Sequence, residues 1–414
     1  MKITKKIGLM LTTMAATVLF GCAVSAAPTG IKQTADTTNT VSLDWDDSSV
    51  PGMYGYGVMV STNKDTWNQS TVVIQGSCTE SNCSIASLTA GKSYWVTIFE
   101  IDESLNIIGS MSTPIEVVTK PSNVAFSGEG GVKQTAAKKN KISVSWPAVA
   151  GATGYEVKVS RSNSYLDASV FANTTATSLN INTKSATYVE VACYRKSSTG
   201  YIAKSANGTN AYNFSLKPAP GKTKMPKITG ENVLGGVNLK YKSVKNCDGY
   251  QIQYCKYNGK GKKKVYTSSN EASLSSWNKT TFYKVRVRAF VKLSNGKKVF
   301  GKWSKYNAFC MDQTSHSIKA SNASTRYSDR VKLSWKKVKG AKNYTLYMST
   351  SENSGYKAVT TTKGTSVTLS SFNGRAFTVY KNYYYYVVAN GKVGKKNYKS
   401  IKKYRKYFYF YRRY

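Results

Sequence analysis

Residues 331–348 read VKLSWKKVKGAKNYTLYM, and this stretch contains the pattern that decides the fold. Apolar residues alternate with polar ones up to Trp335, and a second alternation begins at Tyr344. Side chains on a β-strand point to opposite faces in turn, so this period of two predicts strands with one buried face. The short segment around Gly340 predicts a turn between them. The stretch therefore predicts two consecutive strands of a β-rich unit.

The same pattern occurs four times, at a spacing of about 95 residues. The first run ends in an aromatic residue in every copy: Val41-Leu43-Trp45, Ile142-Val144-Trp146, Val237-Leu239-Tyr241 and Val331-Leu333-Trp335. The second run follows within about a dozen residues: Tyr56-Val58-Val60, Tyr155-Val157-Val159, Tyr250-Ile252-Tyr254 and Tyr344-Leu346-Met348. A third run closes each copy: Tyr94-Val96-Ile98, Val189-Val191-Cys193, Tyr283-Val285-Val287-Ala289 and Tyr383-Tyr385-Val387-Ala389. Four copies predict four all-β domains.

The positions of the aromatic residues resemble the fibronectin type III pattern. Trp stands on the second strand, Gly-Tyr opens the third, and Leu88-x-x-Gly91-x-x-Tyr94 precedes the sixth. The resemblance implies a tandem array of seven-stranded, immunoglobulin-like β-sandwiches, with a tyrosine corner at Tyr94, Tyr283 and Tyr383. The structural core residues that it implies are Trp45, Trp146, Tyr241, Trp335, Tyr94 and Tyr283. The second copy departs from the pattern, with Thr187 in the corner position, and the third carries Tyr241 in place of Trp.

The N-terminus has the order of a secretory signal. Lys2, Lys5 and Lys6 precede an uncharged stretch and a run of small residues, which predicts a signal peptide over 1–26. The alternative is a lipid anchor at Cys22, because the four residues ending there resemble a bacterial lipobox. We expect a secreted protein, extracellular or cell-wall associated, since no later segment is apolar enough to cross a membrane.

Turn-rich segments divide the remaining chain into four fibronectin type III-like domains. The predicted domains are 27–120, 121–220, 221–314 and 315–414. The net charge of +40 is spread unevenly over them: the first carries −6, the second +7, the third +16 and the fourth +20. Such an excess creates a long-range positive potential that attracts anionic partners. The two C-terminal domains are therefore the basic ones, while the first is acidic.

The basic residues concentrate in two segments. Residues 402–414, KKYRKYFYFYRRY, contain only basic and aromatic residues, and a lysine run lies in the third domain. Lys and Arg bind phosphate or carboxylate, while aromatic faces stack on sugar rings or guanidinium groups. The candidate ligand-binding residues are Lys262, Lys263, Lys264, Lys402, Lys403, Arg405, Lys406, Arg412, Arg413 and Tyr414. The alternative for the C-terminal segment is a last strand that buries either its tyrosines or Phe408 and Phe410.

Composition argues against catalysis, a cofactor or a metal site. The only histidine, His316, falls in a predicted linker, and the last two domains together contain six acidic residues. Hydrolytic mechanisms need a paired nucleophile and base or two carboxylates. Cys78 and Cys83 are disulfide candidates, expected to face each other across a tight hairpin. Cys193 is expected to be a buried thiol, and pairing among Cys247, Cys255 and Cys310 is left open.

These features predict a non-catalytic extracellular binding or spacer protein with an adhesive role. Its signal and domains resemble those of Gram-positive bacteria, whose anionic cell-wall polymers or glycans are the expected partners, with another surface protein as a further possibility. One alternative is a purely structural secreted protein whose charge is incidental. Another is nonspecific binding of extracellular nucleic acid, although no specific nucleic-acid-binding motif is present. The oligomeric state is left open.

Overall fold

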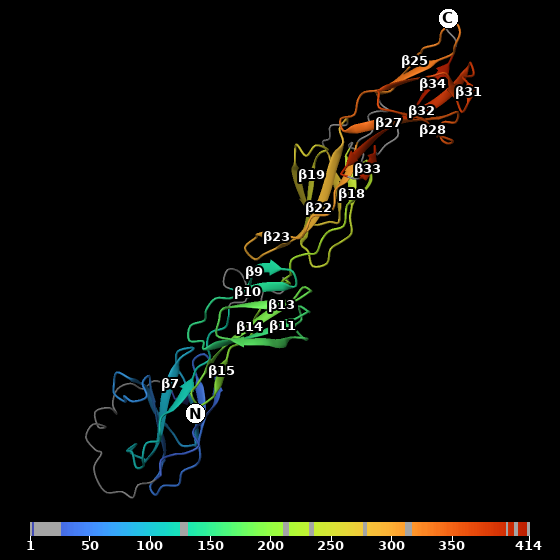
Figure 1. The fold of residues 1–414 in the computed structure, drawn as a ribbon. Coiled ribbons are helices and arrows are strands. Elements are labelled where there is room, and N and C mark those ends of the chain that lie inside the picture. Colours follow the sequence, from blue (N-terminus) through green and yellow to red (C-terminus); the bar gives the residue numbers. More distant parts are fainter. Residues whose placement is uncertain are drawn as a thin grey trace. The chain divides into compact units, whose positions relative to one another are not determined.

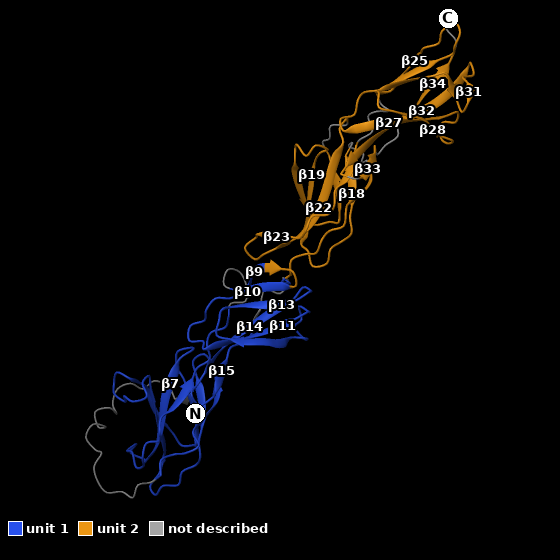
Figure 2. Cartoon of the chain, viewed as in Figure 1, with its two compact units in different colours: residues 1–136, 141–216 blue, residues 137–140, 217–414 orange. Residues whose placement is uncertain are grey.

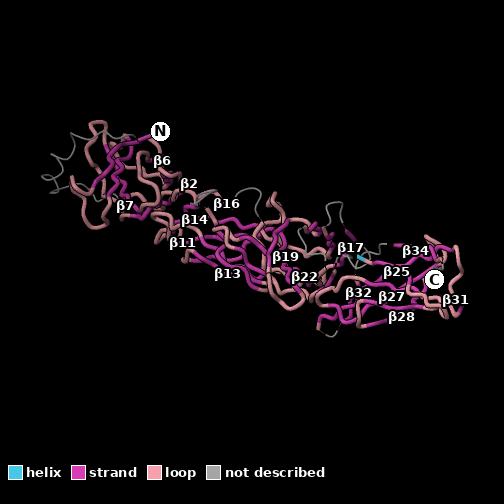
Figure 3. The backbone as a smooth tube through the Cα atoms, turned by 90° about the horizontal axis from the view of Figure 1, so that it is seen from above, coloured by secondary structure: helices cyan, strands magenta, loops and turns pink. Residues whose placement is uncertain are grey.

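The computed structural model describes residues 2–3, 26–124, 131–209, 215–231, 236–275, 280–310, 317–394, 396–400 and 405–411. Strands, turns and loops make up nearly all of this part of the chain (Figures 1 and 3). The predicted signal peptide lies almost wholly outside the described residues. Within it, the structure describes Ala26 and the backbone of β1 (Lys2–Ile3), which runs parallel to β6. No described helix is long and apolar enough to span a bilayer.

The strands form successive pairs of sheets, and we call each pair a module. Module 1 consists of β2 (Lys32–Asp36), β3 (Val41–Asp44), β4 (Gly55–Ser61), β5 (Val72–Cys78), β6 (Asn82–Ile85), β7 (Ser93–Ile101) and β8 (Ile115–Val118). Module 2 consists of β9 (Lys133–Lys138), β10 (Lys141–Ser145), β11 (Gly154–Ser160), β12 (Ser169–Thr174), β13 (Ser178–Asn182), β14 (Tyr188–Lys196), β15 (Ile202–Lys204) and β16 (Gly208–Thr209).

The two following modules repeat this order. Module 3 consists of β17 (Lys227–Glu231), β18 (Val237–Lys240), β19 (Gly249–Lys256), β20 (Lys263–Thr267), β21 (Glu271–Leu274), β22 (Tyr283–Lys292), β23 (Lys298–Phe300) and β24 (Asn307–Phe309). Module 4 consists of β25 (Lys319–Asn322), β26 (Val331–Ser334), β27 (Ala341–Ser349), β28 (Lys357–Thr362), β29 (Ser366–Leu369), β30 (Ser371–Phe372), β31 (Arg375–Ala376), β32 (Lys381–Val393), β33 (Lys396–Lys399) and β34 (Lys406–Phe410).

Every module has the same sheet topology. One sheet contains the first, second and fifth strands, in the order β2-β3-β6 in module 1, and the other has the order β5-β4-β7-β8. Apart from β1, all of these pairings are antiparallel. From module 2 onward the last strand is split into two pieces, as in β33 and β34, which both pair with β32. The predicted all-β fold of fibronectin type III-like sandwiches is confirmed, whereas the predicted domain boundaries remain a prediction.

The cores lie between the sheets and are built from the alternating residues of the sequence pattern. In module 1 they include Val41 and Leu43 from one sheet and Val58 and Val96 from the other, each 0–1% exposed. The structure places all six core residues named above in such clusters, where they are 3–8% exposed: Trp45, Tyr94, Trp146, Tyr241, Tyr283 and Trp335. Burial of side chains this large provides most of the stabilisation of a small sandwich.

A pair of aromatic rings recurs at the centre of every core. The aromatic residue of the second strand packs against the tyrosine of the third, with ring centroids 5.2 Å apart for Trp45 and Tyr56 and 4.9 Å apart for Tyr241 and Tyr250. The hydroxyl of the third-strand tyrosine accepts a hydrogen bond from a backbone N–H; in module 1, Tyr56 accepts it from Ser48. At the corner position the Tyr94 hydroxyl accepts the N–H of Thr89, and Tyr383 does the same in module 4.

The modules are grouped in two compact units (Figure 2). Unit 1 contains residues 1–136 and 141–216, and unit 2 contains residues 137–140 and 217–414. Module 1 and most of module 2 thus form unit 1. Unit 2 contains modules 3 and 4 together with residues 137–140 of module 2.

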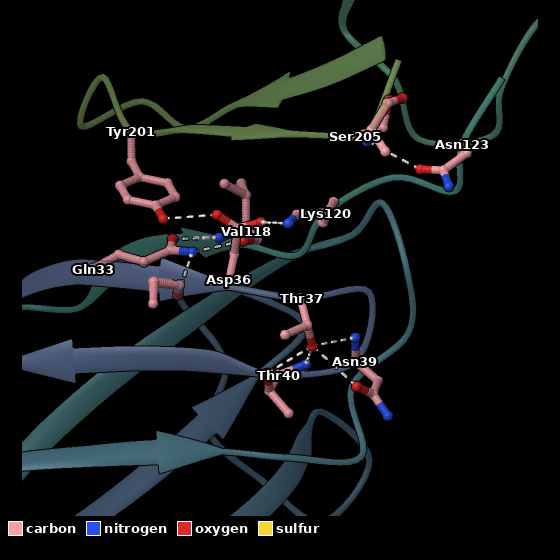
Figure 4. A network of polar contacts seen from close by, with 12 residues as sticks. Gln33, Asp36, Thr37, Asn39, Thr40, Val118, Lys120, Asn123, Tyr201 and Ser205 are labelled. Atoms are coloured by element: carbon pink, nitrogen blue, oxygen red, sulfur yellow. Dashed lines mark hydrogen bonds and ion pairs between the residues drawn. The ribbon is translucent and has the colours of Figure 1, made fainter. Parts of the chain in front are cut away.

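Within unit 1, modules 1 and 2 are joined by polar contacts. Figure 4 shows Tyr201, whose hydroxyl donates to Asp36 Oδ1 at 2.7 Å, while Lys120 Nζ lies 3.6 Å from Asp36 Oδ2. Elsewhere in the joint the carboxylate of Glu116 accepts hydrogen bonds from Ser93 Oγ and from the N–H of Ser198. Each of these bonds joins groups that would otherwise bind water, so the joint gains modest net stability from each one.

Within unit 2, the joint between modules 3 and 4 contains a buried apolar side chain. Phe282, which is 1% exposed, belongs to the core cluster of module 4, although it directly precedes β22 of module 3. Its backbone N–H donates to Lys339 O at 2.9 Å, and Lys339 N–H donates to Thr280 O. A Cβ on Gly391 would lie 2.9 Å from the Phe282 ring, so the absent side chain leaves room for it. The buried ring holds the two basic modules together.

Candidate functional site

The candidate site begins with the alternation along β22. Val285 and Val287 point into the core of module 3 and are 0% exposed. Their neighbours Lys284, Arg286 and Arg288 lie on the opposite, solvent-facing side and are half-buried. Strand geometry thus places three cations in a row on one face of the sheet.

Aromatic rings separate these cations. The Arg286 guanidinium lies 4.8 Å from the ring centre of Tyr306 and 4.3 Å from that of Trp303. The Arg288 guanidinium lies 4.3 Å from the ring centre of Trp303 and 3.8 Å from that of Phe300. Lys284 Nζ lies 5.1 Å from Tyr306. We call this alternating series the cation–aromatic ladder, defined by Lys284, Tyr306, Arg286, Trp303, Arg288 and Phe300.

The segment that carries the rings is held against β22 by its backbone. Ser304 N–H donates to Val287 O at 2.8 Å, and Ser304 Oγ accepts the N–H of Val287 at 3.0 Å. Gly301 N–H donates to Ala289 O. These bonds fix the irregular stretch between β23 and β24 and hold Trp303 over the two guanidinium groups. The ladder is therefore preorganised before any ligand arrives.

Two glutamines hold the guanidinium groups in place. Arg286 donates from Nε and Nη2 to Gln253 Oε1, at 2.9 and 2.6 Å, and Arg288 Nε donates to Gln251 Oε1 at 2.8 Å. Both glutamines lie on β19, directly opposite their arginines. A glutamine orients an arginine without neutralising it. Each planar group consequently keeps its full charge and several unused N–H donors.

No carboxylate neutralises this face within the described parts of the chain. The ion pairs of the described residues do not involve Arg286 or Arg288. The pKa of the Arg288 guanidinium is lowered, mainly by burial and also by the charge of Arg286, while Tyr266 acts in the opposite direction. Like charges held side by side repel each other, and an anion placed across them relieves that repulsion. The ladder has the electrostatic character of an anion-binding surface.

A shallow pocket in the same module also has a cationic lining. It has a volume of about 400 Å³ and is lined by Lys222, Thr223, Lys224, Met225 and Lys305. Thr223 Oγ1 accepts the N–H of Ala289, which anchors this lining to β22. Lys305 lies between Trp303 and Tyr306 in the segment that carries the rings, so this segment contributes a cation to the pocket as well.

The predicted lysine run lies at the start of β20. Lys262, Lys263 and Lys264 are exposed. The register pairs Lys264 with Gln253, and Gln253 pairs on its other side with Arg286. Directly opposed residues share a face, so Lys264 lies in the same row as Arg286. The structure brings this one predicted residue to the ladder.

The predicted C-terminal residues are only partly described. Arg405 and Lys406 are exposed, and Arg405 Nη1 donates to Asn353 Oδ1 at 2.6 Å while its guanidinium lies 5.6 Å from the ring centre of Tyr356. Lys402, Lys403, Arg412, Arg413 and Tyr414 lie outside the described residues. In β34 the two phenylalanines are buried, at 8% and 3% exposed, and the tyrosines face outward.

The cysteines differ from the expected arrangement in one respect. Cys78 ends β5 and Cys83 lies in β6, and these strands belong to opposite sheets, so the expected tight hairpin between them is wrong. Both are buried free thiols that are hydrogen-bonded to each other. That bond is the main cause lowering the pKa of Cys78 and raising that of Cys83. Cys193, Cys255 and Cys310 are buried thiols as well.

Sequence reasoning missed the ladder, although a signal for it exists. Every second residue of β22 from Lys284 to Arg288 is basic, and Phe300, Trp303 and Tyr306 follow in the next segment. Attention to the inward residues alone overlooks this outward period of two. His316 lies outside the described residues, and among the described ones no group of three or more His, Cys, Asp and Glu side chains is placed to hold a metal ion.

Comparisons with known proteins add little to this description. No family model matches the chain, and no curated protein matches it. Among solved structures it is similar to the crystal structure of the chicken CNTN1 FN1–FN3 domains, with 17% sequence identity and a TM-score of 0.30. The match covers 69% of this chain and 98% of that one. Because identity and TM-score are this low, the assignment to tandem fibronectin type III-like sandwiches rests on the sheet topology described above.

Proposed function

We propose that this chain is a non-catalytic, exported binding or spacer protein that associates through its basic modules with anionic cell-wall polymers or glycans. The observation that supports this most is the cation–aromatic ladder, in which Arg286 and Arg288 are held rigidly and form no ion pair with a carboxylate among the described residues. A surface that only keeps the protein soluble needs no such ordering, because solvated lysines serve that purpose.

The ladder suits a polymer better than a small ion. Its cations follow one strand over several residues, and Lys264 extends it sideways across the sheet. A chain of phosphates or carboxylates can contact several of these groups at once, which multiplies weak contacts into stable binding. Planar guanidinium groups also suit the two oxygens of a carboxylate or phosphate.

A pull-down with isolated Gram-positive cell walls tests the proposal. The wild-type chain should bind intact walls at low salt, lose binding at high salt, and bind poorly to walls stripped of anionic polymers. The variant R286Q/R288Q should bind about tenfold more weakly than wild type, because each lost contact to an anion removes a charge-assisted hydrogen bond.

The matched control is R326Q/K363Q, which removes the same charge from two exposed turn positions of unit 2. It should weaken binding much less than the ladder variant. Equal losses in both variants would favour a purely structural protein with incidental charge, and equal binding to stripped walls would contradict the proposal. Tighter binding to extracellular DNA than to walls would favour the nucleic-acid alternative.

A further inference from the structure

A second unexplained surface lies on module 4, along β34. This strand alternates, with Phe408 and Phe410 in the core and Tyr407 and Tyr409 outside, at 64% and 48% exposed. Tyr411, just after the strand, is 44% exposed. Large exposed aromatic groups on a sheet edge promote aggregation, so their accumulation needs an explanation.

Two more rings join this surface, one from β32 and one from the turn residue just before that strand. Tyr384 pairs directly with Tyr407, and their ring centres are 6.0 Å apart. Tyr380 and Tyr409 have ring centres 6.2 Å apart. We call this surface the tyrosine row, defined by Tyr380, Tyr384, Tyr407, Tyr409 and Tyr411.

The backbone at Tyr380 is strained. Its φ angle is +64°, in the left-handed region that side chains other than glycine and asparagine rarely adopt, and its side chain is 75% exposed. This conformation is unfavourable for a residue with a side chain. An exposed ring gains little packing energy to offset that cost. Strain of this kind, held by the Tyr380 N–H bond to Phe410 O, is typical of positions kept for binding.

Polar groups border the row without dominating it. Asn382 is exposed and lies directly opposite Tyr409, so its amide shares the outward face. Arg405 precedes Tyr407 by two residues and is exposed. A pocket of about 100 Å³ beside the row is lined by Arg330, Asn322, Tyr409 and Tyr411, among others. Rings outnumber cations here, whereas the ladder on module 3 has as many cations as rings.

We propose that the tyrosine row binds the sugar rings of an acidic polysaccharide, in which the rings outnumber the acidic groups. This inference rests on the proposed function and specifies its ligand class. Flat tyrosine faces stack on the apolar faces of sugar rings, the Asn382 amide bonds to hydroxyls, and Arg405 and Arg330 meet occasional acidic groups. A nucleic acid has a phosphate at every nucleotide and is bound in grooves with cations along their whole length. A polyphosphate has no ring to stack.

The test compares three polyanions: hyaluronan, in which every second ring is acidic, inorganic polyphosphate and single-stranded oligo-dT. Binding of the full chain is measured by titration at several salt concentrations. In Y407T/Y409T, threonine preserves strand propensity while removing two exposed rings. This variant should bind hyaluronan at least about tenfold more weakly and polyphosphate unchanged, because it removes two stacking surfaces and no charge.

Salt dependence separates the two surfaces. Loss of an ionic contact flattens the dependence of affinity on salt, while loss of a stacking contact lowers affinity equally at all salts. R286Q/R288Q should therefore flatten the salt dependence for hyaluronan and polyphosphate alike. Y407T/Y409T should leave both salt dependences unchanged. The control Y327T removes a tyrosine that is 90% exposed and lies in the turn between β25 and β26, and it should bind all three polymers as wild type does.

A further variant uses the strain at Tyr380. Asparagine tolerates a positive φ angle, so Y380N should keep or raise the melting temperature of the protein and yet weaken hyaluronan binding. Unchanged hyaluronan binding in both tyrosine variants would overturn the inference while leaving the proposed function intact. A greater loss for oligo-dT than for hyaluronan would overturn the assignment to sugar rings. Absence of binding to any polyanion by the wild-type chain would overturn the proposed function itself.

Discussion

Tyr241 occupies in module 3 the position that tryptophan occupies in the other three modules. In the described structure the buried indole N–H groups of Trp45, Trp146 and Trp335 have no hydrogen-bond partner. The Tyr241 hydroxyl instead donates to Ser269 O at 2.9 Å. A buried donor without a partner costs free energy, so the tyrosine satisfies a polar group that the tryptophans leave unsatisfied. Tyr241 thus keeps the aromatic packing of this position and also satisfies its own polar group.

The variant Y241F tests this interpretation. It removes the hydroxyl and leaves Ser269 O without this donor, so it should lower the free energy of unfolding of module 3 by about 1 kcal/mol. Chemical denaturation followed by hydrogen exchange in β18 and β21 would measure the change. Tyr250→Phe is a useful comparison, because the Tyr250 hydroxyl accepts a hydrogen bond from Val244 N–H. Its loss should lower the free energy of unfolding by a similar amount. An unchanged stability of Y241F would show that the hydroxyl bond contributes nothing net.

At the scale of an element, β34 has two separate roles on its two faces. Its inward phenylalanines belong to the core of module 4, and the ring centre of Phe408 lies 5.4 Å from that of the corner residue Tyr383. Its outward tyrosines form the row described above. The alternation that lets one strand serve both roles was visible in the sequence, but which face would be buried was not, because tyrosine and phenylalanine both suit a core.

Replacement of the inward face should destabilise module 4 strongly. F408A/F410A creates cavities in the core, and each such truncation costs about 3–5 kcal/mol. We therefore expect module 4 to lose protection from hydrogen exchange and proteolysis, while modules 1 and 2 remain protected. Y407T/Y409T serves as the matched control on the opposite face and should stay folded. Retained protection in F408A/F410A would contradict the placement of β34 in the core.

At the scale of the whole molecule, the joints distinguish the two compact units. The joint in unit 1 depends on carboxylates such as Glu116, and the joint in unit 2 depends on the buried ring of Phe282. Burial opposes ionisation of Glu116, but hydrogen bonds from Ser93 and Ser198 outweigh it together with the charge of Arg195, and the pKa of Glu116 is lowered. A carboxyl group with a lowered pKa stabilises the folded form above its unfolded pKa, and this contribution is lost as pH falls through its folded pKa.

Acid should therefore loosen the joint of unit 1 and leave that of unit 2 intact. Hydrogen exchange at the Ser198 amide should lose protection below about pH 4, after correction for the intrinsic rate. E116Q should show low protection at every pH, and E103Q, which changes an exposed loop residue, should follow wild type. Protection at the amide of Phe282 should not change over this range. An acid-independent Ser198 amide in wild type would refute the role of Glu116.

The sequence supports predictions about strands better than predictions about surfaces. Alternating runs such as Val331-Leu333-Trp335 predict their own burial, because the period of two is local. The ladder depends on the register between β22 and an irregular segment some fifteen residues later, which no local pattern specifies. For the same reason the sequence does not predict the joints between modules, where residues as distant in sequence as Asp36 and Tyr201 are in contact. Charge counting located the basic modules, yet only the fold shows which cations are ordered.

Because β34 is the last strand of module 4 in the sequence, it affects when this module folds during synthesis. Phe408 and Phe410 belong to the core of module 4, so this core is incomplete until β34 has left the ribosome. Until then the corner residue Tyr383 lacks one of its ring neighbours, Phe408. The module proposed to stack on sugar rings therefore folds after the three modules that precede it, and a chain released before β34 is made would carry those three modules without that surface.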